Sequence, residues 1–174
     1  AGRLSRRGET VEARHVADGF GDEVAMVLDG GTCVVGLEST VLDLSTETPT
    51  LLRAGGVTHE ALEEVIAAPV AVAGVDDTAP KSPGMMSRHY APRTPLRMNA
   101  SEVKRGEALL GFGGSKGAVE DLSPAGDLVE AAANLFRMLH ELDGGGYAGI
   151  AVAPIPESGL GRAINDRLRR AARG

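Results

Sequence analysis

Four closely spaced prolines divide this sequence into two parts. Pro80, Pro83, Pro92 and Pro95 fall within sixteen residues. Proline fixes its own backbone angle, lacks an N–H donor and pushes the preceding residue toward an extended conformation. Neither a helix nor a central strand tolerates that spacing, so residues 74–95 are predicted to form an extended, semi-rigid linker. The chain of 174 residues then has room for two small domains, one on each side of it.

The part after the linker is predicted to be a small parallel α/β domain. Its short apolar runs end at glycine, and its longer segments carry apolar residues every three or four positions. The predicted order is a strand at 107–112, a helix at 124–142, a strand at 149–153 and a helix at 159–172. Strands and helices in alternation favour a parallel sheet with crossover helices, as in Rossmann-like domains.

The part before the linker also mixes strands and helices, so the whole chain is assigned to the α/β class. Thr58 is a favourable N-cap for one of its helices. The predicted elements are a helix at 12–20, strands at 23–31, 32–44 and 50–53, a helix at 58–66 and a strand at 69–73.

Composition excludes several classes of protein. Hydrophobic residues make up 43% of the chain and charged residues 24%, the balance of a globular protein rather than a disordered or membrane one. The net charge of -6 gives no reason to expect tight nucleic-acid binding. No apolar stretch approaches the ~20 residues of a membrane span, which leaves a cytoplasmic location by default. The single cysteine, Cys33, excludes an internal disulfide and is predicted to be a buried structural thiol.

Two polar features interrupt the apolar pattern of the first part. Glu38, Ser39 and Thr40 lie inside a predicted strand, where they must either pair within the fold or face a polar ligand. Arg53 ends another strand beside a flexible Ala-Gly-Gly turn. Its guanidinium could grip a carboxylate or a phosphate, or it could form a surface salt bridge. The residues alone leave these alternatives open.

The linker and the tail carry further candidates. Arg88, His89 and Tyr90 stand between prolines; the arginine could meet a phosphate and the tyrosine could stack on a base, whereas a lone histidine is more often structural. The glycine-rich loop at 113–117 matches neither phosphate-binding fingerprint and is predicted to be a plain turn. The arginines of the last helix resemble an RNA patch, but cations near a helix C-terminus also complement its dipole. The remaining histidines are too dispersed to indicate a metal site.

Taken in order, the motifs of this chain resemble the two-domain L-threonylcarbamoyladenylate synthases. The resemblance extends over nearly the whole chain, from a loop remnant at Ala1–Ser5 to the final helix. It is carried by Gly36-Leu37-Glu38-Ser39-Thr40-Val41-Leu42-Asp43, Leu52-Arg53-Ala54-Gly55-Gly56, Lys81-Ser82-Pro83-Gly84-Met85, Arg88-His89-Tyr90-Ala91-Pro92 and Gly159-Leu160-Gly161-Arg162-Ala163-Ile164-Asn165-Asp166-Arg167-Leu168.

The resemblance implies a fold and an activity. It implies the C-terminal part of a YrdC-like α/β synthase domain at 1–73, an interdomain linker and lid at 74–95, and a Rossmann-like domain at 96–174. The family condenses L-threonine, bicarbonate and ATP into threonylcarbamoyl-adenylate and pyrophosphate. The product feeds threonylcarbamoyladenosine modification of tRNA, so the tRNA-modification machinery is an indirect partner.

The resemblance also implies roles for individual residues. It assigns two residues to L-threonine, namely Ser39 and Thr40. It assigns five to ATP, namely Ser5, Arg53, Arg88, His89 and Tyr90. Magnesium is expected to travel with ATP, and neither a protein metal ligand nor a catalytic residue is assigned.

One departure from the family pattern bears on activity. The family's basic Lys-Arg motif and its Ser-x-Asn motif should both precede Ala1, so neither stands at its expected place in this sequence. We therefore expect a nucleotidyltransferase family member whose present chain is incomplete for catalysis. The alternative is a non-catalytic nucleotide-binding or interaction module, which would bind adenine nucleotide without regard to L-threonine.

Overall fold

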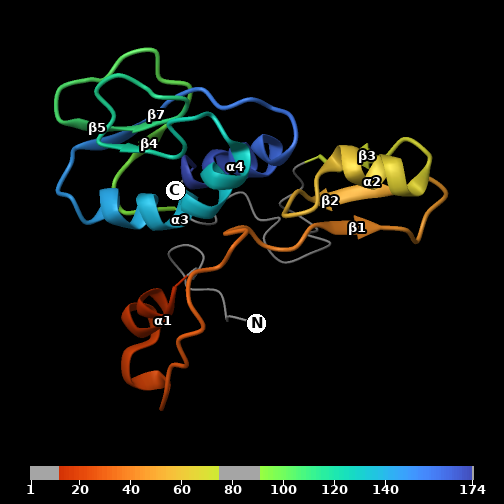
Figure 1. The fold of residues 1–174 in the computed structure, drawn as a ribbon, viewed down its shortest axis with the longest axis horizontal. Helices are drawn as coiled ribbons and strands as arrows, with labels where there is room; N and C mark the ends of the chain where they lie inside the picture. Colours follow the sequence, from red (N-terminus) through yellow and green to blue (C-terminus); the bar gives the residue numbers. More distant parts are fainter. Residues whose placement is uncertain (1–11, 75–90, 174) are drawn as a thin grey trace.

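The chain folds around two separate β-sheets (Figure 1). A computed structural model describes residues 12–74 and 91–173. One sheet has three strands in the order β1-β2-β3, and the other has four in the order β4-β7-β5-β6. The α/β class predicted from the sequence is confirmed. Most of the predicted linker lies outside the described residues.

The four-stranded sheet is parallel throughout. It consists of β4 (Leu96–Arg97), β5 (Glu107–Gly111), β6 (Glu120–Asp121) and β7 (Gly149–Val152). Helices α3 (Leu128–Asp143) and α4 (Leu160–Ala171) lie together on one side of it (Figure 1). This is the parallel unit that strand–helix alternation predicted. The two-residue strands β4 and β6 were not foreseen, because so short a pairing leaves no periodicity to detect.

The core of this unit lies between the two helices and the sheet. Leu135, Phe136 and Leu142 of α3 are almost completely buried, as are Ile150 of β7 and Ile164 of α4. These side chains lie on the apolar stripe of each helix, so the 3.6-residue period of the sequence dictates which face is covered. The core is aliphatic, as the scarcity of aromatic residues requires.

An arginine and a glutamate tie the two strands that flank β7. Arg97 of β4 donates from Nη2 to Glu107 Oε2 of β5 at 2.7 Å and from Nε to Oε1 at 3.2 Å. These hydrogen bonds, followed by one from the Lys104 N–H, lower the pKa of Glu107 to about 2. A bidentate pair of this kind fixes direction as well as distance.

The three-stranded sheet is mixed. Strand β1 (Val41–Asp43) runs antiparallel to β2 (Thr50–Arg53), and β3 (Ala71–Val72) runs parallel to β2. Helix α2 (His59–Ile66) makes the crossover between β2 and β3. The predicted cap is confirmed, because the Thr58 side chain accepts a hydrogen bond from the Ala61 N–H.

The strand predicted at 23–31, and most of the one predicted at 32–44, are wrong. After α1 (Ala13–Phe20) and the short 3-10 turn at Gly21–Glu23, the chain runs to β1 without a helix or strand. Leu28 is 86% exposed and Val34 82%. An apolar, β-branched run becomes a strand only when another strand pairs with its backbone, and within residues 12–74 and 91–173 none does so. Cys33 is exposed too, so the prediction of a buried thiol is wrong.

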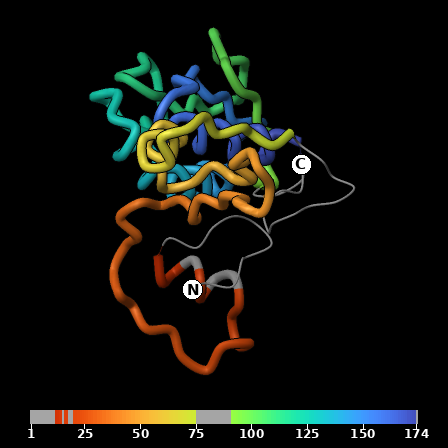
Figure 2. Tube along the Cα trace, turned by 90° about the vertical axis from the view of Figure 1, so that its right-hand side faces the viewer, coloured from red at the N-terminus to blue at the C-terminus, as the bar shows by residue number. Residues whose placement is uncertain are grey.

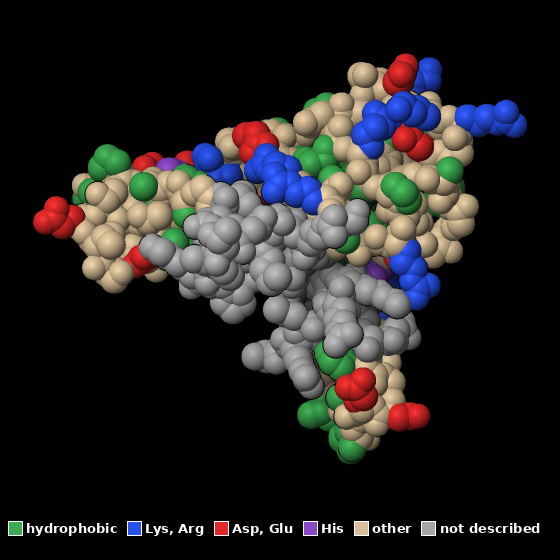
Figure 3. Space-filling view, turned by 180° about the vertical axis from the view of Figure 1, so that it is seen from behind, with side chains coloured by type: hydrophobic (Ala, Val, Ile, Leu, Met, Phe, Trp, Pro, Cys, Tyr) green, Lys and Arg blue, Asp and Glu red, His purple; other side chains and the backbone are tan. Residues whose placement is uncertain are grey.

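Two views show how this first stretch is placed. Helix α1 and the chain that follows it project away from both sheets (Figures 1 and 2). Seen from behind, this projection and the three-stranded sheet both carry hydrophobic side chains on their surfaces (Figure 3). None of the described helices has the length and apolar character needed to cross a membrane.

The chain returns to the body of the molecule at Gly36. This glycine is buried with a φ of +65°, and a Cβ built on it would lie 2.4 Å from the Ala132 carbonyl oxygen of α3. The next residue, Leu37, packs against the core of the four-stranded unit. The polar residues Glu38, Ser39 and Thr40 follow directly, so their position is set by this contact with α3.

Candidate functional site

Two polar segments meet at one end of the β1–β2 pair. Glu38 to Thr40 immediately precede β1, and Ala54 to Val57 immediately follow β2. Because the strands are antiparallel, with Val41 opposite Arg53, the residues before one strand lie beside the residues after the other. The motif around Ser39 and the motif around Arg53 are thus neighbours in space.

Hydrogen bonds fasten the two segments to each other. The Gly56 N–H donates to the Glu38 carbonyl oxygen at 3.2 Å. The Thr40 hydroxyl donates to the Val57 carbonyl oxygen at 2.6 Å and accepts from the Val57 N–H at 3.0 Å. Such reciprocal bonds hold irregular backbone in one conformation without a strand partner.

The close approach depends on a glycine. Gly55 is buried, and a Cβ at this position would lie 2.2 Å from the Glu38 carbonyl oxygen and 2.5 Å from the Thr40 nitrogen. Backbone atoms cannot move aside as a flexible side chain can. The Gly-Gly pair after Arg53 is therefore needed for packing as well as for turning.

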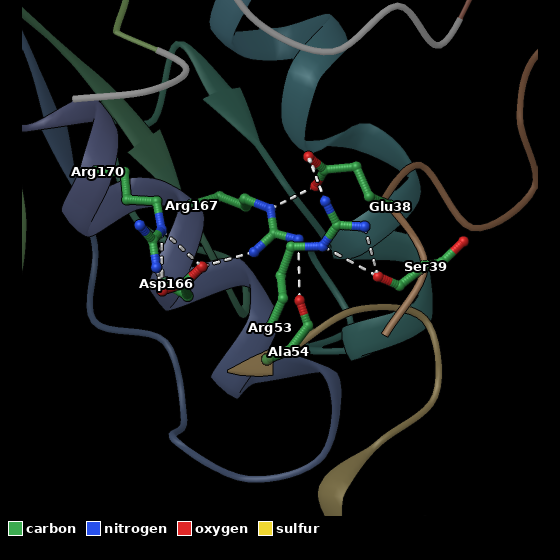
Figure 4. A network of polar contacts seen from close by, with 7 residues as sticks. All are labelled: Glu38, Ser39, Arg53, Ala54, Asp166, Arg167 and Arg170. Carbon is green, nitrogen blue, oxygen red and sulfur yellow. Dashed lines mark hydrogen bonds and ion pairs between the residues drawn. The ribbon is translucent and has the colours of Figure 1, made fainter. Parts of the chain in front are cut away.

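Arg53 reaches across to the first segment. Its Nε and Nη2 donate to the Ser39 carbonyl oxygen at 3.1 and 2.9 Å, and its Nη1 lies 4.0 Å from Glu38 Oε1 (Figure 4). The side chain is only 11% exposed, which is inconsistent with a surface salt bridge. Figure 4 shows the Ser39 hydroxyl directed away from the guanidinium.

A second arginine comes from α4, the helix that packs on the four-stranded sheet. Arg167 of α4 donates from Nε to Glu38 Oε2 at 2.6 Å and from Nη2 to the Ala54 carbonyl oxygen at 2.9 Å (Figure 4). Its side chain is completely buried, although arginine is seldom buried unless paired. Glu38 therefore bridges Arg53 and Arg167, which come from different parts of the fold.

Arg167 is itself held on the far side. Its Nη1 donates to Asp166 Oδ2 at 2.6 Å. Asp166 also accepts from Arg170, with Nε at 3.0 Å from Oδ2 and Nη2 at 2.9 Å from Oδ1. The described polar chain runs Arg53, Glu38, Arg167, Asp166 and Arg170.

Arg167 was not predicted as a site residue. The arginines of the last helix were considered as a set, and the one on the apolar face was not singled out. The signal was present, because Arg167 lies three residues after Ile164 and four before Ala171, both of which are buried. A charged residue at a core position of a helix indicates a buried partner elsewhere.

A second, more exposed contact joins α2 of the three-stranded unit to the start of α4 of the four-stranded unit. Glu60 of α2 accepts from the Gly159 N–H at 3.3 Å, and Arg162 Nη2 lies 3.7 Å from the same oxygen. The pKa of Glu60 is lowered, chiefly by its own backbone N–H and then by the Gly159 N–H and Arg162. Glu60 and Arg162 belong to neither of the two segments at the end of the β1–β2 pair, which makes this contact a useful reference for the buried one.

The structure brings together part of the predicted site. Ser39, Thr40 and Arg53 form one cluster, whereas Ser5, Arg88, His89 and Tyr90 lie outside the described residues. In the parts of the chain that the structure describes, no group of three or more His, Cys, Asp or Glu side chains could hold a metal ion. A serine hydroxyl beside an arginine suits the recognition of carboxylate or phosphate oxygens, whereas the Thr40 hydroxyl is bonded to Val57.

Comparison with known protein families identifies the family to which this chain belongs. A family model described as threonylcarbamoyl-AMP synthase, C-terminal domain, matches residues 57–173. A second model, described as telomere recombination, matches residues 2–55. The chain belongs to the threonylcarbamoyl-AMP synthase family, with part of a YrdC-like domain followed by the family's C-terminal domain. The family predicted from the motifs is confirmed.

Curated relatives agree with the family assignment. The threonylcarbamoyl-AMP synthase of Pyrococcus abyssi is 34% identical over 97% of this chain and 55% of its own length. That of Bacillus subtilis is 34% identical over 98% and 55%. The enzyme of Schizosaccharomyces pombe is 30% identical over 97% and 50%. This chain thus spans about half the length of the curated relatives that it matches.

Solved structures share the fold. The crystal structure of Pyrococcus abyssi Sua5 complexed with L-threonine superposes with a TM-score of 0.82 at 33% identity, covering 98% of this chain and 56% of that one. A variant of the same protein, in which a histidine and the following tyrosine are replaced by alanine, gives a TM-score of 0.81 at 31% identity. Both cover the three-stranded and the four-stranded sheet.

Proposed function

We propose that this chain provides the L-threonine site and part of the ATP site of a threonylcarbamoyl-AMP synthase. The reaction condenses L-threonine, bicarbonate and ATP into threonylcarbamoyl-adenylate and pyrophosphate. The threonine amine and bicarbonate first form a carbamate with loss of water. A carbamate oxygen then attacks the α-phosphorus of ATP, and the bond between the α- and β-phosphates breaks as pyrophosphate leaves. The product would pass to the tRNA-modification machinery, with the cytoplasm as the proposed location.

One observation carries this proposal. Arg53 donates two hydrogen bonds to the carbonyl oxygen of Ser39, so the proposed phosphate ligand is fixed to the proposed threonine ligand. A reaction that joins threonine to the α-phosphate needs the two substrates at a fixed separation. The relative that superposes on 98% of this chain was solved with L-threonine, which supports a threonine site in the shared region.

The described residues suggest how the roles divide. The Ser39 hydroxyl is directed away from Arg53 and is the proposed contact for L-threonine. The Thr40 hydroxyl bonds to Val57 on both its donor and acceptor sides, so Thr40 would shape the threonine site through its backbone. The Arg53 guanidinium would stabilise a phosphate oxygen as pyrophosphate leaves.

The remaining roles rest on the family resemblance. Ser5 is proposed to touch ATP, and Arg88, His89 and Tyr90 are proposed to cover the nucleotide as a lid. Magnesium would enter as part of the MgATP substrate, held by the phosphates. The proposed division of the chain is a synthase-domain part at 1–73, a linker at 74–95 and a Rossmann-like domain at 96–174.

Calorimetric titration with MgATP, with and without saturating L-threonine and bicarbonate, tests the proposal. We expect L-threonine to bind and to strengthen MgATP binding. Ser39→Ala should weaken L-threonine binding, and Arg53→Gln should weaken MgATP binding. Arg169→Gln is the matched control, because Arg169 pairs with Glu157 on the surface.

Two results would count against the proposal. MgATP binding that ignores L-threonine would favour the alternative of a nucleotide-binding module. Binding of neither substrate by the folded chain would show that residues 1–174 do not form a working half of the site. Pyrophosphate release, measured in parallel, reports whether bound substrates also react.

A further inference from the structure

We propose that Arg167 is a positioning residue for the substrate site, acting from the C-terminal helix on both segments that form it. This inference rests on the proposed function of Ser39 and Arg53. Arg167 donates hydrogen bonds to the chain neighbours of both proposed substrate contacts. It holds the residue before Ser39, which is Glu38, and the residue after Arg53, which is Ala54.

The geometry favours positioning over mere packing. The three nitrogens of the guanidinium donate to three different acceptors: Nε to Glu38, Nη2 to Ala54 and Nη1 to Asp166. A planar fork that is bonded in three directions cannot rotate without breaking one of the bonds. The separation of the Glu38 carboxylate and the Ala54 carbonyl is therefore set by one rigid group.

Asp166 orients the Arg167 guanidinium. It precedes Arg167 in the helix and holds Nη1, while Arg170 one turn later holds Asp166 from the other side. All three residues lie on α4, which is anchored in the core by Ile164 and Leu168. The Arg167 guanidinium is thus held on a rigid helix independently of its bonds to Glu38 and Ala54.

The contact makes the site depend on the second sheet. Helix α4 belongs to the four-stranded unit, whereas Glu38 and Ala54 border the three-stranded sheet. A displacement of α4 would move Glu38 and Ala54 together, and with them Ser39 and Arg53. The C-terminal domain would in this way set the distance between the threonine and phosphate contacts.

Two variants and one control test this inference in the full chain. Arg167→Lys keeps the positive charge but loses the planar guanidinium with its three donor nitrogens. Glu38→Gln keeps the shape of the side chain but loses the ion pair. Arg162→Gln is the control, because it removes the exposed ion pair with Glu60 between the same two units. Each is measured for L-threonine affinity by calorimetry, for melting temperature, and for hydrogen exchange at the Gly56 and Val57 amides.

Hydrogen exchange reports on the conformation of the site in the absence of a ligand. The Gly56 amide bonds to the Glu38 carbonyl and the Val57 amide to the Thr40 hydroxyl, so both report whether the two segments stay fastened. We expect Arg167→Lys and Glu38→Gln to speed exchange at these amides by about tenfold or more, with α4 itself still protected. Arg162→Gln should leave them unchanged.

The binding measurement separates positioning from stability. A hydrogen bond to a charged ligand contributes about 10- to 100-fold in affinity, so displacement of Ser39 in Arg167→Lys should lower L-threonine affinity by about that factor. A merely structural role would lower the melting temperature and leave the affinity of the folded variant intact. Unchanged affinity of folded Arg167→Lys, whatever its melting temperature, would therefore overturn the inference.

The outcomes also separate this inference from the proposed function. If the unsubstituted chain binds no L-threonine, the proposed function fails, and exchange at Gly56 and Val57 alone decides whether Arg167 positions the segments. If Arg167→Lys does not fold, Glu38→Gln answers the same question from the opposite side of the pair.

Discussion

Replacing Gly36 by alanine should loosen the docking of the site onto α3. Gly36 is where the chain returns from its projecting stretch and packs against the Ala132–Ala133 backbone. Two independent costs arise there. The φ of +65° is strained for any residue with a side chain, and the added Cβ would lie 2.4 Å from the Ala132 carbonyl oxygen and 2.7 Å from the Ala133 Cα.

The magnitude follows from these two costs. An L-residue held in the left-handed region costs about 1–2 kcal/mol. The overlap is with helix backbone, which cannot rotate away, so the segment must shift; overpacking of this kind typically costs about 1–3 kcal/mol. We therefore expect the free energy of unfolding to fall by about 2–5 kcal/mol. That is a large share of the ~5–15 kcal/mol available to an ordinary domain.

Gly31 provides the matched control. It also has a positive φ, +85°, but a Cβ there would meet no atom within 4 Å. Gly31→Ala should therefore cost only the conformational part, about 1–2 kcal/mol. Urea denaturation followed by circular dichroism measures both variants. Equal losses would show that Gly36 does not pack on α3 as described and would refute the reasoning.

Two further predictions concern other contacts. The pKa of Glu107 is lowered to about 2 from its ordinary value of 4.5, chiefly by Arg97, so the pair stabilises the fold above about pH 4.5 and loses that contribution as the pH falls toward 2. Urea stability measured from pH 7 to pH 2 should show the gap between the unsubstituted chain and Arg97→Gln closing over that range; a constant gap would contradict the prediction. Gly55→Ala would place a Cβ 2.2 Å from the Glu38 carbonyl oxygen and should abolish L-threonine binding in calorimetry, whereas Gly30→Ala, which meets nothing within 4 Å, should leave binding intact.

The helices were predictable because the signals for them are local. Thr58 caps α2 through a bond to an amide three residues on, and the apolar period of α3 lies within sixteen residues. Their boundaries were less predictable. The helix expected from residue 124 begins at Leu128, because the Asp127 carboxylate caps it by accepting from the Val129 N–H. A cap decides a boundary, and several residues before Leu128 could have served.

The failures occurred where structure depends on a distant partner. Residues 23–31 are apolar enough for a strand, yet within the described parts of the chain no strand pairs with them. The Glu38–Arg167 ion pair joins residues 129 positions apart, a separation at which the sequence carries no periodic signal. Sequence reasoning can flag each charge as unusual, but only the packing of α4 against the β1–β2 end shows that the two charges meet.

The candidate site was predictable in part: its residues could be predicted from the sequence, but their arrangement could not. Ser39, Thr40 and Arg53 could be selected from their motifs and from the family resemblance. Their arrangement could not, because it depends on the register of β1 and β2, which contains an irregularity between Val41 and Leu42. A slip of one residue would turn the side chains of a strand to the opposite face. The bond from Arg53 to the Ser39 carbonyl is therefore a product of pairing rather than of composition.

A paired substitution asks what the buried ion pair contributes. Removing one partner of a buried pair leaves the other charge uncompensated and costs about 3–5 kcal/mol, whereas replacing both with apolar residues of similar size is often neutral or stabilising. We therefore expect Glu38→Leu and Arg167→Met to be strongly destabilising alone, and the double variant to recover most of that loss in urea denaturation. L-threonine binding should not recover with it, because an apolar pair restores packing but not the hydrogen bond to Ala54 that fixes the direction of the segment. A double variant that regained both stability and affinity would mean that the pair fills space only, and that the C-terminal helix does not position the site.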